Sequence, residues 1–340
     1  MPGSYFGAPA PEIFLLNPFP LGLETCQMNL RPLPHRFSYN SSGMQRRSLI
    51  ISLVVCALLS ACGTSSGSTS GVAASAYIQN IGSDTIVNLA LAWAERYQQE
   101  NPEVRISVSG GGSGTGIAAL INGTVDIANA SRQIKPEEVN EAKKNGIEPK
   151  QYVIARDAIA VIVNPGNPVN QLTLEQVSKI YRGEINNWRE LGGENRPIVR
   201  LSRETNSGTH VYFLESVIRL GDPNNKAIFS ADTLLLPSSE GIIAEVSENP
   251  NTIGYDGLGY VTKTVKVLAL AKDPAGGYVM PSVETVNNDS YPISRDLYMY
   301  TGGNPSAAVQ TYLEWIMGTE AQEIVSELGF VPIIRQTSYK

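Results

Sequence analysis

The chain has 340 residues, 42% hydrophobic and 17% charged, so it is long enough to bury a large core and to form about two domains. Four of its 26 Lys and Arg residues and two of its 32 Asp and Glu residues precede residue 62, which leaves 22 cationic and 30 acidic side chains and a net charge of −8 in the remainder. This acidic balance argues against nonspecific nucleic-acid binding, and an anion bound here must be held by local dipoles and a few fixed cations.

The N-terminal part contains the pattern of a signal peptide. Arg46 and Arg47 precede an apolar run at 49–59, which is shorter than the roughly 20 residues that a membrane-spanning helix needs. The run ends in Leu-Ser-Ala-Cys at 59–62, which resembles the lipobox of bacterial lipoproteins. We therefore expect residues 44–61 to be a lipoprotein signal peptide and Cys62 to be the lipidated first residue of the mature chain. An ordinary secretory signal is the alternative.

The segments on either side of this signal carry no folded pattern. Residues 1–43 show no periodicity, and we expect translation to start at Met44, which makes 1–43 a non-native extension. Cys26 and Cys56 both precede Cys62, so no disulfide can form inside the mature chain. The segment 62–76 is rich in Ser, Gly, Thr and Ala and is expected to be a flexible tether.

From Tyr77 onward, short β-rich runs alternate with helical patterns, which predicts an α/β fold. Apolar residues recur at helical spacing within 85–101, and 104–108 then alternates as a strand does. Thr173 with Gln176, and Thr319 with Gln322, have the spacing of capping boxes and predict helix starts.

The order of the strand-like runs predicts two lobes. The β-rich segments 152–163 and 252–261 bracket a middle block of helices and strands. A chain that leaves one lobe, builds a second and returns produces this order, with the two crossing segments as a hinge. We expect lobe one to be residues 77–157 plus 257–340 and lobe two to be residues 158–256.

Three strand-like runs end in a small, glycine- and hydroxyl-rich turn that opens into a helix. The first backbone N–H groups of a helix lack partners and carry partial positive charge, and Ser or Thr adds a hydroxyl donor. Each turn is therefore a candidate anion site, although Ser and Thr are also ordinary helix caps. The glycines match neither G-x-G-x-x-G nor a P-loop, which disfavours a nucleotide site. The three turns are Gly82 to Thr85, Gly110 to Gly116, and Ser207 to Thr209.

Charged residues near these turns are candidates to complete a site. Arg203 lies four residues before Ser207 and offers a planar, permanently charged donor beside a helix start. Ser131 and Arg132 follow another β-rich run. Asp157 is unusual in an apolar strand. It is either structural, with a hinge-side hydrogen bond or an ion pair to Arg156 or Arg132, or an acceptor for a proton carried by the ligand.

These motifs together resemble the phosphate-binding proteins of phosphate-specific ABC importers, which have the class II periplasmic-binding-protein fold. The resemblance runs from about Tyr77 to Pro332. Some members have an aspartate that accepts the phosphate proton where this chain has Arg132, so the resemblance leaves Asp157 as the first candidate acceptor and Asp84 as the second. The resemblance and the charges near the turns together give the expected phosphate ligands as Ser83, Asp84, Thr85, Ser113, Ser131, Arg132, Asp157, Arg203, Ser207, Gly208 and Thr209.

The function that the resemblance implies is capture of inorganic phosphate between two lobes and delivery to a membrane-embedded ABC permease. We expect a monomeric, lipid-anchored, extracytoplasmic protein with no catalytic residue, cofactor or metal. Two alternatives remain at this point: a binder of another tetrahedral oxyanion such as molybdate or sulfate, or a surface phosphatase or serine hydrolase. The second alternative would need a base, and His210 is the only histidine after residue 62.

Overall fold

A computed structural model describes residues 76–333, all within one compact unit, Thr69–Lys340. The predictions for the extension 1–43, the start at Met44, the signal 44–61, Cys62 and the tether up to residue 75 lie outside the described residues. The strands are β1 Ala76–Gly82, β2 Val104–Ser109, β3 Ile127–Ala130, β4 Lys150–Val163, β5 Gln171–Thr173, β6 Val199–Arg203, β7 Leu234–Leu236, β8 Thr252–Gly257, β9 Lys266–Val267, β10 Ala269–Ala271 and β11 Ser294–Thr301.

The helices connect and cover these strands, which confirms the predicted α/β fold. Short helices η1 Trp188–Leu191, η3 Leu258–Tyr260 and η4 Pro274–Gly276 are of the 3₁₀ type, and η2 Leu214–Ile218 is a π-type turn that continues α6. The α-helices are α2 Asp84–Glu100, α3 Ser113–Ile121, α4 Pro136–Lys144, α5 Leu174–Tyr181, α6 Gly208–Phe213, α7 Ser239–Glu248, α8 Val283–Asn287, α9 Ala307–Ile316 and α10 Thr319–Glu327.

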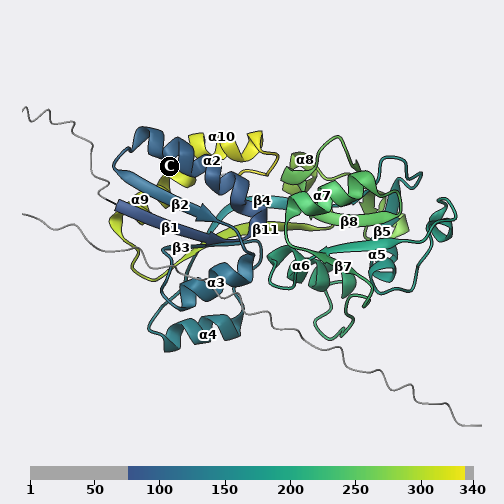
Figure 1. Ribbon diagram of the computed structural model, residues 1–340, viewed down its shortest axis with the longest axis horizontal. Helices are drawn as coiled ribbons and strands as arrows, with labels where there is room; N and C mark the ends of the chain where they lie inside the picture. The colour runs from purple at the N-terminus through teal and green to yellow at the C-terminus, as the bar shows by residue number, and fades with distance from the viewer. Residues whose placement is uncertain (1–75, 334–340) are drawn as a thin grey trace, which may run out of the picture. The chain divides into compact units, whose positions relative to one another are not determined.

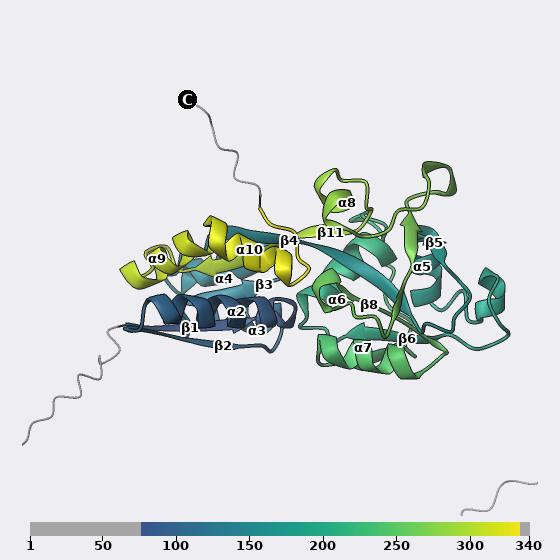
Figure 2. The same ribbon diagram turned by 90° about the horizontal axis from the view of Figure 1, so that it is seen from above.

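The main sheet has the strand order β2-β1-β3-β11-β4-β8-β6-β7, with β9 also paired to β4. The long strand β4 belongs to both halves of this sheet, as Figure 2 shows. Its residues 150–158 pair antiparallel with β11, and its residues 159–163 pair antiparallel with β8. Because β1, β2 and β3 are parallel neighbours, their carboxyl ends point the same way. The loops that follow them therefore lie close together, near the middle of the long sheet.

The strands β4 and β11 are the two segments that pass from one half to the other. The structure differs here from the predicted boundary at residue 257. Tyr260 of η3 still reaches the first half, where it donates to the carbonyl of Asp84, but β9 then pairs with the end of β4 and β10 pairs with β5. Leu268, Val286 and Ile293 pack in the same cluster as α5 and α6. We therefore use first lobe for residues 76–157 and 294–333, and second lobe for residues 158–293.

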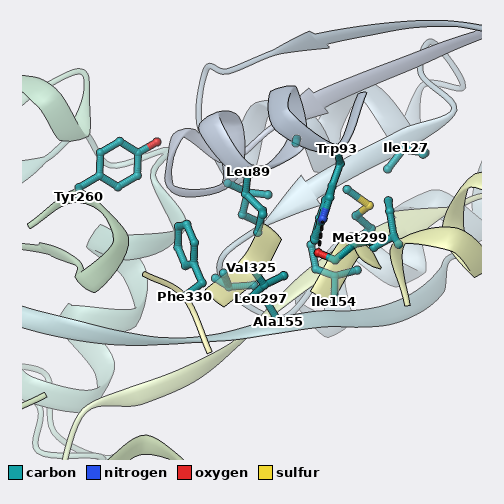
Figure 3. Packing of buried hydrophobic residues seen from close by; sticks show 14 of the residues in the cluster. Leu89, Trp93, Ile127, Ile154, Ala155, Tyr260, Leu297, Met299, Val325 and Phe330 are labelled. Atoms are coloured by element: carbon teal, nitrogen blue, oxygen red, sulfur yellow. Dashed lines mark hydrogen bonds between the residues drawn. The ribbon is translucent and has the colours of Figure 1, made fainter. Parts of the chain in front are cut away.

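Helices cover both faces of the sheet (Figure 1). One hydrophobic cluster lies under α2, α9, α10 and α7. A second lies under α5, α6 and α8, and a smaller one lies under α3. In the first cluster Trp93 is fully buried and donates from Nε1 to the carbonyl of Ala321 at 2.8 Å. Figure 3 shows its ring beside Ile154 and Met299, so α2 is fixed to β4, β11 and α10.

The local predictions that depend on helix starts are largely confirmed. Thr173 accepts from the backbone N of Gln176, whose side chain returns the bond, so this capping box begins α5. The Thr319 prediction is wrong in detail, because Gly318 is the cap residue and Thr319 is already the first residue of α10. All three predicted turns lie between a strand and a helix: β1 and α2, β2 and α3, and β6 and α6.

Candidate functional site

Three buried serines of the first lobe meet where β1, β2 and β3 end. Ser83 precedes α2, Ser113 begins α3, and Ser131 follows β3. The hydroxyl of Ser83 donates to Ser131 Oγ at 2.9 Å, and Ser113 Oγ lies 3.3 Å from Ser131 Oγ. The backbone N–H of Ser131 donates to Ser113 Oγ at 3.0 Å. Three loops far apart in sequence thus present their hydroxyls at one point, because parallel strands end at the same edge.

The start of α6 in the second lobe lies against these hydroxyls. A Cβ placed on Gly208 would lie 2.3 Å from Ser113 Oγ and 2.6 Å from Ser131 Oγ, so a larger residue would force these hydroxyls or the helix start to move. Ser207 caps the helix by accepting from the N–H of Thr209 at 3.2 Å. Thr209 Oγ1 lies 2.8 Å from Thr85 Oγ1 of the first lobe. We call the six residues Ser83, Thr85, Ser113, Ser131, Ser207 and Thr209 the hydroxyl cluster.

Arg203 ends β6 beside the hydroxyl cluster and is 1% exposed. Its Nη1 donates to Ser239 Oγ at 2.7 Å, and its Nη2 donates to Asp84 Oδ2 and to the carbonyl of Pro237, both at 2.8 Å. Its Nε is buried and has no partner within the described residues. Arg203 is therefore a rigidly held cation with one donor left for another group.

Asp84 connects the two lobes. It is the first residue of α2, and besides the bond from Arg203 it accepts at Oδ1 from the backbone N–H of Gly111, at 2.9 Å. A second interlobe contact lies beside it, where Asn206 accepts at its backbone O from the N–H of Gly114 and donates from Nδ2 to the carbonyl of Gly111, both at 2.9 Å. The described structure is therefore a closed arrangement of the two lobes.

Arg295 was not predicted from the sequence. It lies on β11, is 6% exposed, and donates from Nη1 to the carbonyl of Ser131 at 2.9 Å. Its Nη2 lies 2.9 Å from Thr209 Oγ1 and 3.0 Å from Asp157 Oδ2, and its Nε has no partner in the described part of the chain. A signal was available: an arginine at the start of a strand-like run in which the following side chains are largely apolar.

Asp157 lies on β4 directly across from Arg295 and is fully buried. Its Oδ1 accepts from the N–H of Leu258 at 3.1 Å and its Oδ2 accepts from Arg295. Burial raises the pKa of this carboxyl to about 6, against the lowering effect of Arg295. Its ion-pair partner is thus neither Arg156 nor Arg132, and each of its oxygens already has a protein donor.

The guanidinium of Arg132 lies beside the site and binds another side chain of the protein. Its Nη1 and Nη2 donate to the two carboxylate oxygens of Glu138, at 2.8 and 2.7 Å. Burial raises the pKa of Glu138, but the bonds from Arg132 and from the backbone N–H of Lys135 outweigh this and lower it overall. Arg132 lines a cavity of about 450 Å³ between the start of α4 and α6, which Ser131 and Arg295 also line.

Asp256 and Ser239 also belong to the site without having been predicted from the sequence. Asp256, on β8, is fully buried and accepts at Oδ1 from Ser239 Oγ at 3.0 Å. Its Oδ2 lies 3.7 Å from Arg203 Nη1 and makes no hydrogen bond to any described residue. We call Asp84, Asp157, Arg203, Asp256 and Arg295 the charge network.

His210 faces away from the hydroxyl cluster. Its Nδ1 lies 3.0 Å from Ser202 Oγ, and its ring stacks on Phe229 with the centroids 4.4 Å apart. Among residues 76–333, no group of three or more His, Cys, Asp or Glu side chains is arranged to hold a metal ion. No helix in the same range is long and apolar enough to cross a membrane.

Comparison with known proteins places this geometry in a family. The PBP superfamily domain matches residues 67–320. The phosphate-binding protein PstS of Pseudomonas aeruginosa is 32% identical over 280 residues, which cover 77% of this chain and 85% of the relative. PstS of Bacillus subtilis is 30% identical over 305 residues, covering 85% of this chain and 95% of the relative. The chain belongs to the phosphate-binding protein family of the PBP superfamily.

Solved structures agree with this assignment to the phosphate-binding proteins. A phosphate ABC transporter substrate-binding protein from Clostridium perfringens, crystallised with bound phosphate, superposes with a TM-score of 0.68 at 32% identity, over 76% of this chain and all of that one. An ABC-type phosphate transport receptor from Vibrio cholerae gives a TM-score of 0.60 at 27% identity. The predicted family and the two-lobed periplasmic-binding-protein fold are thereby confirmed.

Proposed function

We propose that this phosphate-binding protein captures inorganic phosphate at the hydroxyl cluster and delivers it to an ABC importer. The observation that carries the proposal is the contact of Gly208 with Ser113 and Ser131. It brings helix starts of both lobes, with their N–H and O–H donors, to one buried point. A tetrahedral anion is the ligand that satisfies such a set.

The number of donors matches what burial of an anion requires. Removing a multiply charged ion from water is very costly unless each oxygen finds donors. Hydrogen bonds to a charged group contribute about 1.5–3 kcal/mol each, so six to eight of them support micromolar to nanomolar affinity. We assign this role to the hydroxyl cluster, to Gly208 and to the Nε of Arg203, and add the Nε of Arg295.

Three residues of the expected ligand set receive other roles in this proposal. Arg132 is held by Glu138 and lines the adjoining cavity, so it acts at the mouth of the site. Asp157 and Asp84 each orient an arginine, Asp157 through Arg295 and Asp84 through Arg203. Closure around the ligand is then the signal that the importer's permease reads, since both lobes contribute donors.

The proposal extends to the location and the oligomeric state of the protein. Residues 44–61 direct export, Cys62 carries the lipid, and the chain acts as a monomer on the outer side of the membrane. The similar solved structures are a phosphate ABC transporter substrate-binding protein and a phosphate transport receptor. A hydrolase is disfavoured because His210 binds Ser202 instead of a serine of the hydroxyl cluster. No cofactor is needed for capture and release.

Calorimetry tests the proposal on the full chain, with phosphate, arsenate, sulfate and molybdate titrated separately. We expect tight binding of phosphate and arsenate and much weaker binding of sulfate. The variant Arg203→Ala should lose at least tenfold in phosphate affinity, whereas Arg105→Ala, an exposed arginine of β2, should not. Molybdate or sulfate binding more tightly than phosphate would replace phosphate with that ion, and turnover of a chromogenic phosphate ester would favour the hydrolase.

A further inference from the structure

The charge network beneath the hydroxyl cluster is not neutral. It holds two cations, Arg203 and Arg295, and three carboxylates, Asp84, Asp157 and Asp256, which gives a net charge of −1 when all are ionised. All but Asp84 are at most 6% exposed, and the side chain of Asp84 is 21% exposed. A phosphate dianion enclosed beside this network would bring the local charge to −3 among buried side chains, where like charges repel strongly.

Asp256 differs from the other two carboxylates of the network. Each oxygen of Asp84 and of Asp157 accepts a hydrogen bond from an arginine or from the backbone. Asp256 accepts two bonds at Oδ1, from Ser239 Oγ at 3.0 Å and from Gly257 N at 2.7 Å. Its Oδ2 accepts none from the described residues, and the nearest cation, Arg203 Nη1, is 3.7 Å away. A buried anionic oxygen without a donor is costly, and a proton removes that cost.

The groups that face Asp256 come from five neighbouring elements. Arg203 of β6 and Arg295 of β11 favour the charged carboxylate, as do the donors of Ser239 and Gly257. Asp157 of β4 repels it and is itself raised in pKa by Asp256. The phenol of Tyr260, on η3, is neutral and is raised in pKa partly by Asp256. Burial outweighs these favourable contacts and raises the pKa of Asp256.

We propose that enclosure of a phosphate dianion is coupled to uptake of one proton by the carboxylate of Asp256. The proton comes from solvent and joins Asp256 at Oδ2; the phosphate keeps its own proton, and no bond to phosphorus changes. The inference rests on the proposed function, because it requires phosphate to occupy the hydroxyl cluster. Its consequence is that the site binds a dianion plus a proton, and so holds phosphate more weakly as the pH rises.

The test is calorimetry between about pH 8 and pH 9, where free phosphate is mostly the dianion. Titration in two buffers with different ionisation enthalpies gives the number of protons taken up per phosphate, which we expect to be close to one. Phosphate affinity should then fall about tenfold per pH unit. Uptake near zero in the parent chain would overturn the proposal, whereas the absence of any phosphate binding would instead overturn the proposed function.

The variant Asp256→Asn assigns the proton to its residue. Asn keeps an acceptor for Ser239 and Gly257 and is permanently neutral, so the variant should bind phosphate at least as tightly as the parent at high pH, with proton uptake near zero. The matched control is Asp296→Asn, which removes a carboxylate from β11 whose side chain is 42% exposed and should leave proton uptake unchanged. Full uptake retained in Asp256→Asn would overturn the assignment.

An infrared difference spectrum of the unmodified protein covers the case in which Asp256→Asn fails to fold. Adding phosphate at high pH should produce the C=O stretching band of a protonated carboxylic acid, with loss of a carboxylate band. The absence of that band in phosphate-saturated protein would overturn the proposal without any substitution.

Discussion

Asp157 and Arg295 face each other across the two strands that pass between the lobes, with Asp157 Oδ2 and Arg295 Nη2 3.0 Å apart. The same nitrogen of Arg295 lies 2.9 Å from Thr209 Oγ1 of the second lobe, and Nη1 binds the carbonyl of Ser131 in the first. One buried ion pair therefore connects the hinge strands β4 and β11 to the hydroxyl cluster. A change at this pair affects both the stability of the fold and the anion site.

Replacing Arg295 with Met should destabilise the protein strongly, because it leaves Asp157 buried without its cation. Breaking a buried pair in this way costs about 3–5 kcal/mol, measurable by urea unfolding without phosphate. The double variant Arg295→Met with Asp157→Asn should recover part of the loss. Arg156→Met is the matched control on β4, because that arginine pairs with the exposed Asp289 and the partly exposed Asp296. Its replacement should cost no more than about 1 kcal/mol. Equal losses of stability in Arg295→Met and Arg156→Met would contradict this role of Arg295.

Replacing Gly208 with Ala should weaken phosphate binding while leaving the separate lobes folded. The added Cβ would meet Ser113 Oγ and Ser131 Oγ at 2.3 and 2.6 Å, and both hydroxyls belong to the other lobe. Overpacking of this kind costs about 1–3 kcal/mol, so phosphate affinity should fall about 10- to 100-fold by calorimetry.

The control for Gly208→Ala is Gly241→Ala in the first turn of α7, where the nearest atom to an added Cβ is Ser238 Oγ at 3.4 Å. This variant should bind phosphate like the parent. The free energy of unfolding without phosphate should be unchanged or slightly higher in both variants, because alanine restricts the unfolded chain more than glycine does. Parent-like affinity in Gly208→Ala would show that the lobes do not meet at this point when phosphate is bound.

The sequence predicted those parts of the site that depend on local structure. Ser83, Ser113 and Ser207 were found because a glycine- or hydroxyl-rich turn between a strand and a helix is visible in a few consecutive residues. Arg295 and Asp256 were missed because their partners are distant in sequence: Arg295 meets Asp157 only when β11 is placed beside β4. The pairing of strands decides which buried charges meet, and no local pattern contains that information.

The lobe boundary differed from the prediction for a similar reason. The segment 252–261 was expected to cross between lobes because it is β-rich and follows the middle block. In the structure β8 ends at Gly257, whose N–H binds Asp256 and whose neighbour Leu258 binds Asp157, and the chain then returns to pair β10 with β5. The crossing near residue 293 has the same strand character, so composition alone could not separate the two.

Replacing Asn206 with Ala should speed phosphate release. The side chain donates to the carbonyl of Gly111 at 2.9 Å across the lobes and is exposed, so its loss weakens the closed state without unfolding either lobe. One such bond contributes about 0.5–1.5 kcal/mol, and the dissociation rate by stopped flow should rise no more than about tenfold. Asn195→Ala removes an exposed bond to Asn187 within the second lobe and should leave the rate unchanged. Equal release rates in the two variants would remove Asn206 from the closing contacts.

His210 should make the fold sensitive to mild acid. It is 7% exposed, its Nδ1 lies 3.0 Å from Ser202 Oγ, and Ser202 is also bound by Tyr255 at 2.6 Å. Burial lowers the pKa of His210 below its ordinary value, so the folded protein resists a proton that the unfolded chain accepts. Above the unfolded pKa, about 6.5, the histidine is neutral in both states and has no effect; as the pH falls below that value, stability is lost until the folded pKa is reached.

The variant His210→Phe separates this effect from the titration of other groups. Phenylalanine keeps the stacking on Phe229 but cannot be protonated, so the urea midpoint should fall less between about pH 7 and pH 5 than in the parent. The test compares how much stability each protein loses between the two pH values, and not the stability at either pH. Loss of the Ser202 contact is expected to lower the stability of the variant equally at both pH values. If parent and variant lose the same stability over this interval, His210 is not the group that titrates. Asp157 cannot account for such a loss. Its pKa is raised to about 6 in the fold, so its protonation favours the folded state as the pH falls.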